Sequence, residues 1–176
     1  MKRILWTLFL LPLACGPTEF NTVQAERYSM DIADYMSSTT DLNQEASLQY
    51  QSPVREVYVA VIDESKAELQ ALNLFFSLPA YSDLANQNFG TLPEHTIEKQ
   101  ENAQINGLNA IVTDFSATLP ENNAGVFYRL AVVESPTHFY QITGWTLKER
   151  RDLYYDDLTR MIQSFREGTA ETVAEE

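Results

Sequence analysis

Cysteine, glycine, histidine and basic side chains are all scarce in this chain of 176 residues. Its single cysteine, Cys15, excludes an intramolecular disulfide. Six glycines are too few for a glycine-rich phosphate cradle, and the motifs of nucleophile-elbow hydrolases, P-loop enzymes and zinc proteases are missing. The two histidines, His95 and His138, lie far apart in sequence with no cysteine partner near them. We therefore expect a protein that is not an enzyme, with no catalytic residue, no metal site and no cofactor.

Basic side chains are outnumbered, with 12 Lys and Arg against 25 Asp and Glu, which gives a formal net charge of −13. Such a surface repels phosphate backbones, so nucleic acid is excluded as a partner. The same field disfavours adsorption to anionic lipid head groups, which makes a specific lipid anchor more useful than a charged patch. The adjacent carboxylates Asp63-Glu64 and Asp156-Asp157 are interpreted as solvated surface, because sequence neighbours do not face one pocket.

A positively charged start, Met1-Lys2-Arg3, runs directly into an apolar segment from Ile4 to Ala14. This layout is typical of a secretory signal peptide. The apolar segment is shorter than the roughly 20 residues that a membrane-spanning helix needs. The sequence therefore predicts export, with residues 1–14 as a cleaved leader.

The leader ends at Ala14-Cys15-Gly16, which resembles the lipobox of bacterial lipoproteins. The resemblance implies that the chain is cut before Cys15 and that the thiol of Cys15 carries the lipid. Pro12 and Leu13 depart from the family pattern, which favours leucine and a small residue at these positions. The alternative is an ordinary cleaved leader with an incidental cysteine. Because Gly16 is no aspartate-type retention signal, lipidation predicts a place in the cell envelope, at the outer membrane rather than the inner one.

The mature chain is expected to hold one domain between two flexible ends. Residues 15–24 are polar and without pattern, which predicts a lipidated tether. Residues 168–176 carry three glutamates and little to bury, which predicts an acidic disordered tail. Residues 25–167 remain as a single α+β domain, long enough to fold without disulfides or metals.

The sequence of the first half of this domain predicts strands followed by helices. Alternating and β-branched residues indicate strands at 27–32, 46–51 and 56–62. Ser65 and Glu68 form a capping-box pattern that begins a helix. A second helix is expected to begin at Ser77-Leu78-Pro79, because proline fits a first helical turn. Its inward-facing residues are expected to be Tyr81, Leu84 and Ala85.

The second half predicts a four-strand meander and a closing helix. Asn106-Gly107 favours a type I′ hairpin turn, and further turn residues at 122–125 and 135–137 separate three apolar runs. A second capping box at Thr146 to Glu149 is expected to begin the helix. The core residues of that helix recur at helical spacing: Leu147, Tyr154, Leu158, Met161, Ile162 and Phe165. The whole predicts an antiparallel sheet of about six to seven strands flanked by helices.

Several segments of the chain resemble the Mog1/PsbP-like family, which includes small bacterial lipoproteins. They are Gln104 to Ala110, Phe127 to Leu130, Tyr140 to Gly144 and Met161 to Arg166. The resemblance implies an α/β/α sandwich over residues 25–167. Asp31 to Asp34 stands where the family often has a proline and a tryptophan after the first strand. The family fold hosts unrelated tasks, so the resemblance implies a fold and not an activity.

These observations predict a membrane-anchored, exported lipoprotein whose non-enzymatic domain binds or supports another envelope component, with a protein as the expected partner. One alternative is a hydrolase assembled from scattered carboxylates and histidines. Another is a periplasmic ligand carrier with a cavity lined by aromatic residues. Aromatic side chains gather in the last third of the chain, at Tyr128, Tyr140, Trp145, Tyr154 and Tyr155. They predict either core packing or a recognition surface on one face of the sheet.

Overall fold

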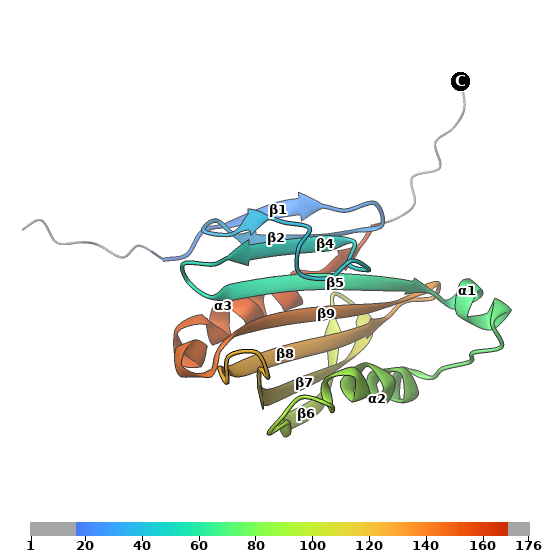
Figure 1. Ribbon diagram of the computed structural model, residues 1–176. Coiled ribbons are helices and arrows are strands. Elements are labelled where there is room, and N and C mark those ends of the chain that lie inside the picture. The colour runs from blue at the N-terminus through green and yellow to red at the C-terminus, as the bar shows by residue number, and fades with distance from the viewer. Residues whose placement is uncertain (1–16, 169–176) are drawn as a thin grey trace, which may run out of the picture.

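The computed structural model of the protein describes residues 17–168 (Figure 1). The leader, Cys15 and all but the first residue of the expected tail lie outside the described residues. No helix within residues 17–168 is long and apolar enough to cross a membrane.

The main sheet has seven antiparallel strands in the order β3-β4-β5-β9-β8-β7-β6. The predicted meander is confirmed as its last four strands, each paired with its sequence neighbour. Asn106 and Gly107 have φ angles of 48° and 87°, as a type I′ turn requires. The strands are β3 (Ser37–Ser38), β4 (Leu48–Ser52), β5 (Val57–Ser65), β6 (Thr96–Ile105), β7 (Leu108–Thr118), β8 (Gly125–Glu134) and β9 (His138–Leu147).

A second, smaller sheet contains β1 (Phe20–Gln24), β2 (Tyr28–Ala33) and β10 (Arg166–Glu167) in the order β1-β2-β10. The folded chain thus begins before the predicted domain boundary at residue 25. Residues 20–24 are polar enough to suggest a tether, but each of them pairs antiparallel with a residue of β2. Phe20 and Val23 also pack against the core. Because β1 is a strand through its pairing with β2, residues 20–24 themselves carry no sequence pattern that predicts a strand.

Within residues 17–168, three α-helices accompany the sheets: α1 (Lys66–Ala71), α2 (Leu78–Phe89) and α3 (Arg151–Gln163), the last preceded by the 3-10 turn η1 (Lys148–Arg150). The side-chain oxygens of Ser65 and Ser77 accept the backbone N–H groups of Glu68 and Ala80, as the predicted helix starts require. The predicted cap at Thr146 is wrong. Thr146 is buried in β9, and α3 begins with no side-chain cap.

The two faces of the main sheet carry separate cores. In Figure 1, α3 lies behind the sheet and α2 lies in front of it. The rear core packs α3 and β2 against the sheet. Gly144 of β9 permits the close approach of α3 to the sheet, because a Cβ at this position would lie 2.9 Å from Leu158 Cδ2. The front core packs α2 against β7 and β8. Leu147 packs in the front core rather than the α3 core, and Leu84 is exposed rather than inward-facing.

One ion pair is buried on the α3 face of the sheet. Arg129 of β8 donates from Nη1 to both carboxylate oxygens of Asp114 on β7, each at 2.8 Å. Tyr155 of α3 completes the cluster by donating its hydroxyl to Asp114 at 3.1 Å. Because each charged group has its partner, the cluster ties α3 to the sheet without leaving a buried charge unpaired.

Candidate functional site

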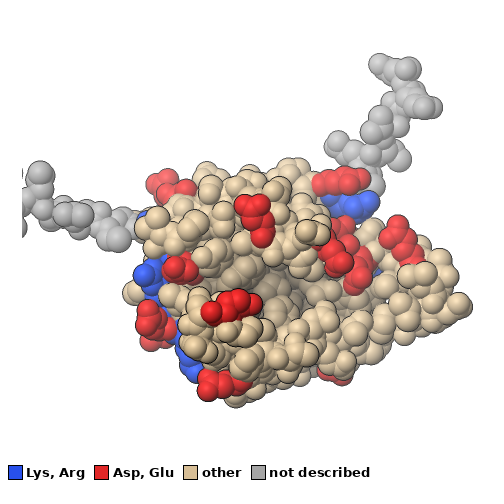
Figure 2. Space-filling view, viewed as in Figure 1, with Lys and Arg blue, Asp and Glu red and all other residues tan. Residues whose placement is uncertain are grey.

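The front face of the main sheet is only partly covered. Helix α2 packs over β7 and β8, while β5 and β9 continue beyond it. A groove of about 330 Å³ lies there, and Figure 2 shows it as a hollow near the centre of the front face. Its volume is at the lower end of the range of roughly 300–1,000 Å³ that is usual for small-molecule sites. The groove is therefore the candidate functional site.

The floor of the groove is formed by alternate residues of three neighbouring strands. Successive residues of a strand point to opposite faces, so Ile142 of β9 enters the rear core while Gln141 and Thr143 face the groove. The complete floor consists of Ala60 and Ile62 from β5, Tyr128 from β8, and Gln141, Thr143 and Trp145 from β9.

One wall of the groove is a loop between β3 and β4 that presents Leu42 and Asn43. The side chain of Gln49, which is only 7% exposed, holds this loop. Its Oε1 accepts the backbone N–H groups of Leu42 and Asn43, both at 2.9 Å, and its Nε2 donates to the Asn43 carbonyl at 2.7 Å. The wall is thus fixed before any ligand arrives.

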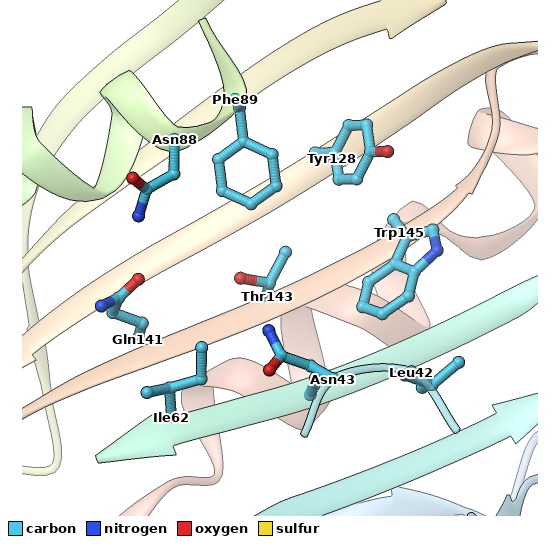
Figure 3. Close-up of a pocket in the computed structure, with 10 residues that line it drawn as sticks. Leu42, Asn43, Ile62, Asn88, Phe89, Tyr128, Gln141, Thr143 and Trp145 are labelled. Atoms are coloured by element: carbon cyan, nitrogen blue, oxygen red, sulfur yellow. The ribbon is translucent and has the colours of Figure 1, made fainter. Parts of the chain in front are cut away.

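The opposite wall is the last turn of α2, which presents Asn88 and Phe89. Figure 3 shows the side chains of Asn88, Gln141, Thr143 and Asn43 arranged around the middle of the groove. Three side-chain amides and one hydroxyl therefore approach a common space from both walls and the floor.

An aromatic row crosses four neighbouring strands on this face. Phe115 of β7, Tyr128 of β8, Trp145 of β9 and Tyr58 of β5 occupy directly paired positions. The ring planes of successive members are within 9° to 28° of parallel, with centroids 4.9 to 6.3 Å apart. Phe115 is buried, whereas Trp145 and Tyr58 are only partly covered, so the row runs from the core into the open groove. Of the two predicted roles for the aromatic residues, core packing thus describes one end of the row and surface exposure the other.

The amide of Gln141 is held in place from beneath α2. Its Nε2 donates to the hydroxyl of Tyr81 at 2.8 Å, and Tyr81 donates in turn to the carboxylate of Glu64. Burial, together with the Glu64 carboxylate, raises the pKa of Tyr81 above its ordinary value, so this hydroxyl stays protonated. This bond uses one of the two Nε2 hydrogens, and the Gln141 Oε1 makes no hydrogen bond to another described residue.

The lining of the groove contains no charged side chain among the described residues. Figure 2 shows carboxylates around the hollow, while its floor is neutral. Burial raises the pKa of Tyr128, and the nearby Glu121 adds to the shift, so the ring in the floor also stays neutral at physiological pH. The lining thus offers side-chain amides, hydroxyls and aromatic surface.

The two histidines lie outside the groove and at opposite ends of the sheet. His95 packs on Phe115 with ring centroids 5.2 Å apart. His138 pairs with Ser65 at the far end of β9, and its Nδ1 lies 2.9 Å from the Thr137 hydroxyl. Within residues 17–168, no group of three or more His, Cys, Asp or Glu side chains is placed to hold a metal ion.

The charged pairs singled out in the sequence are also separated by the fold. Asp63 binds Arg27 at 3.2 Å, whereas Glu64 accepts from Tyr81 on the other face of the sheet. Asp157 accepts from Tyr35 at 2.9 Å and is not simply solvated. These acids serve as anchors between elements.

The groove was not apparent from sequence because it is built from neutral residues that carry no motif. One local signal did exist. Gln141 and Thr143 alternate with buried residues in β9, a central strand whose front face was expected to lie under a helix. Polar residues at covered positions of a central strand indicate that the cover is incomplete.

No protein-family model and no curated protein sequence matches the chain, but solved structures do. The solution structure of cyanobacterial PsbP from Synechocystis sp. PCC 6803 matches with a TM-score of 0.60 at 10% identity, covering 88% of this chain and 96% of that chain. LpqN from Mycobacterium tuberculosis, which is involved in cell envelope biogenesis, matches with a TM-score of 0.63 at 10% identity. The match covers 88% of this chain and 93% of LpqN. The Saccharomyces cerevisiae Ran-binding protein Mog1p matches with a TM-score of 0.52 at 9% identity. The match covers 85% of this chain and 96% of Mog1p.

Similarity at this level of identity establishes the fold and does not transfer an activity. The predicted α+β class, with an antiparallel sheet between helical layers, is confirmed by the strand order and by these structures. The chain has the Mog1/PsbP-like fold that its hairpin and core residues suggested.

Proposed function

We propose that the protein is an exported lipoprotein, anchored through Cys15, whose domain binds another component of the cell envelope in the front groove without catalysing a reaction. The observation that carries the proposal is the groove itself, a preformed site in which the neutral polar groups and the Trp145–Tyr58 end of the aromatic row are partly exposed. The similarity to LpqN, a protein of envelope biogenesis, supports the cellular setting.

The lipid anchor rests on the sequence alone. An apolar leader that ends at the chain's only cysteine supports it, and the strongly acidic composition disfavours adsorption to anionic lipid through a charged patch. Cys15→Ala should release the protein into the soluble exported fraction, as measured by fractionation in high salt. Membrane retention of this variant would remove the anchor from the proposal.

Site-specific photo-crosslinking in the native envelope tests the binding role. A benzoylphenylalanine at Thr143 lies in the groove, and the same group at Asp152 lies exposed on α3 as a matched control. We expect a discrete crosslinked product from position 143 and none from position 152. Equal products from both positions, or none from either, would contradict binding in the groove.

The ligand-carrier alternative would use the same groove, since its floor holds the exposed end of the aromatic row. An open site of this volume binds part of a larger molecule more readily than it encloses a whole one. For this reason a fixed envelope component is the favoured occupant.

A further inference from the structure

We propose that the front groove binds a neutral saccharide, with sugar hydroxyls held by the amides of Asn43, Asn88 and Gln141 and the ring packed on the aromatic floor. This inference rests on the proposed binding role and specifies its ligand. The juxtaposition of neutral amides and aromatic rings in one preformed groove carries it.

Free hydrogen-bonding groups converge on the groove. Among the described residues, the side chains of Asn88 and Thr143 make no hydrogen bond, and the Nδ2 of Asn43 makes none either; Figure 3 shows these three side chains around the middle of the groove. An amide presents both donors and acceptors, which matches hydroxyl groups that also donate and accept. A ligand rich in hydroxyls would therefore satisfy these groups at once.

The charge of the site excludes ionic ligands. The chain has a net charge of −13 and carboxylates surround the hollow, so phosphates, nucleotides and uronates are repelled. A cation would be attracted to the surroundings, but the lining holds no carboxylate to pair with it. A neutral ligand is favoured because it needs no charged partner, and the lining supplies none.

The polarity of the site excludes a purely apolar ligand. An acyl chain in the groove would remove the amides and the Thr143 hydroxyl from water without replacing their hydrogen bonds. A sugar avoids this loss because its edge carries hydroxyls while its ring faces carry C–H groups. In Figure 3 the rings of Phe89 and Trp145, which are only partly buried, lie beside the polar side chains, so both kinds of surface are available together.

The position of the groove argues against an extended peptide. Strand-like peptides add to a free sheet edge through backbone hydrogen bonds. The floor strands β5, β9 and β8 are paired on both sides, so their backbone groups are already used. Only side chains are available to bind a ligand in the groove. This favours a ligand with many hydrogen-bond donors and acceptors of its own.

Tryptophan fluorescence gives a direct test, because Trp6 and Trp145 are the only tryptophans in the chain. In the full-length Trp6→Phe variant, solubilised in a non-sugar detergent, Trp145 is the single reporter, and it lies in the groove floor. Titration uses chitotetraose and maltotetraose as neutral probes and tetragalacturonate as an anionic one. We expect a saturable change in Trp145 emission with at least one neutral probe and none with the anionic probe.

Two groove variants and one control assign the response to the groove. Thr143→Val removes the hydroxyl at constant shape, and Asn88→Ala removes an exposed amide of α2; each should weaken binding roughly threefold to tenfold. Gln104→Ala, in β6 away from the groove, should leave binding unchanged. Thermal melting of every variant establishes that each remains folded.

The outcomes separate the ligand class from the binding role. No response to neutral probes at millimolar concentration, a stronger response to tetragalacturonate, or equal weakening by Gln104→Ala would overturn the saccharide proposal. If position 143 still crosslinks to a protein in that case, the ligand is a protein and the proposed binding role stands. If position 143 captures nothing as well, both proposals fail.

Discussion

The two faces of the seven-stranded sheet are made by the same strands but differ in what covers them. Behind the sheet, α3 and the small sheet bury Val59, Ile142 and Leu158 completely. In front, α2 lies mainly over β7 and β8, reaches β9 only at Phe139 and Gln141, and leaves Gln141 and Thr143 partly exposed. The rear core is the larger of the two, while the front face has partly exposed positions that are free for ligand binding. Substitutions on the two faces should therefore affect different measurements.

The strongest test of the rear face is the buried ion pair. Arg129→Met leaves the Asp114 carboxylate buried without its partner, and we expect a loss of about 3–5 kcal/mol in the free energy of unfolding. Urea denaturation followed by circular dichroism measures it. The double variant Arg129→Met, Asp114→Leu should recover most of the loss, because no charge is then left unpaired. A single variant as stable as the parent would show that the pair is not important to the rear face.

Leu158→Ala tests the packing of α3 on the sheet. Leu158 is fully buried against Gly144, so its truncation leaves a cavity and should cost about 2–5 kcal/mol. Leu153→Ala on the same helix is the matched control. Leu153 is 72% exposed, so its truncation should change stability by no more than about 0.5 kcal/mol. Similar losses from both variants in thermal denaturation would contradict the assignment of α3's inner side.

Gln49→Ala tests the wall of the groove. Removing its side chain leaves the backbone groups of Leu42 and Asn43 without partners and should cost about 1–3 kcal/mol. Hydrogen exchange of the Leu42 and Asn43 amides should accelerate while exchange in β9 stays slow. Gln51→Ala, two residues further along β4, is the control and should leave these amides protected. Acceleration across the whole sheet would mean that Gln49 supports the fold and not only the loop.

The smallest expected effect on stability is at the groove floor. Thr143→Val should change the free energy of unfolding by no more than about 0.5 kcal/mol, because this side chain makes no hydrogen bond to another described residue. The same variant should weaken ligand binding, as stated above. Denaturation and binding measured on one preparation therefore distinguish the two faces. A loss as large as that of Leu158→Ala would erase the distinction.

Local signals in the sequence explain which parts of the fold were predictable. Asn106-Gly107 and the later turns specify the meander within a few residues, and Ser65 and Ser77 mark helix starts through their own side chains. Strand β1 could not be found in this way, because its partner β2 supplies the reason for its shape. Thr146 had the spacing of a cap, but extension of β9 through that position placed it in the core.

The groove depends on longer-range relations still. The partners of Gln49 lie six and seven residues away, across the loop that it holds. The aromatic row joins residues from β5, β7, β8 and β9. Their proximity can be predicted only once the order of these strands in the sheet is known. The sequence showed that aromatic residues gather in the last third of the chain, but only the extent of α2 decides which of them remain open.

The chain is fastened to the rear side of the domain close to its amino-terminal end. The Thr18 hydroxyl donates to Asp157 of α3 at 3.2 Å, and the Asp34 N–H donates to the Glu19 carbonyl at 2.9 Å. With a lipid on Cys15, as proposed, only Gly16 and Pro17 would lie between the lipidated residue and this attachment, and the three steps from Cys15 to Thr18 span at most roughly 10 Å. Such a short linker would hold the rear face of the domain toward the bilayer and orient the groove away from it. The domain would then sample only a thin layer above the membrane, where the effective concentration of any fixed ligand is high and a weak site is sufficient.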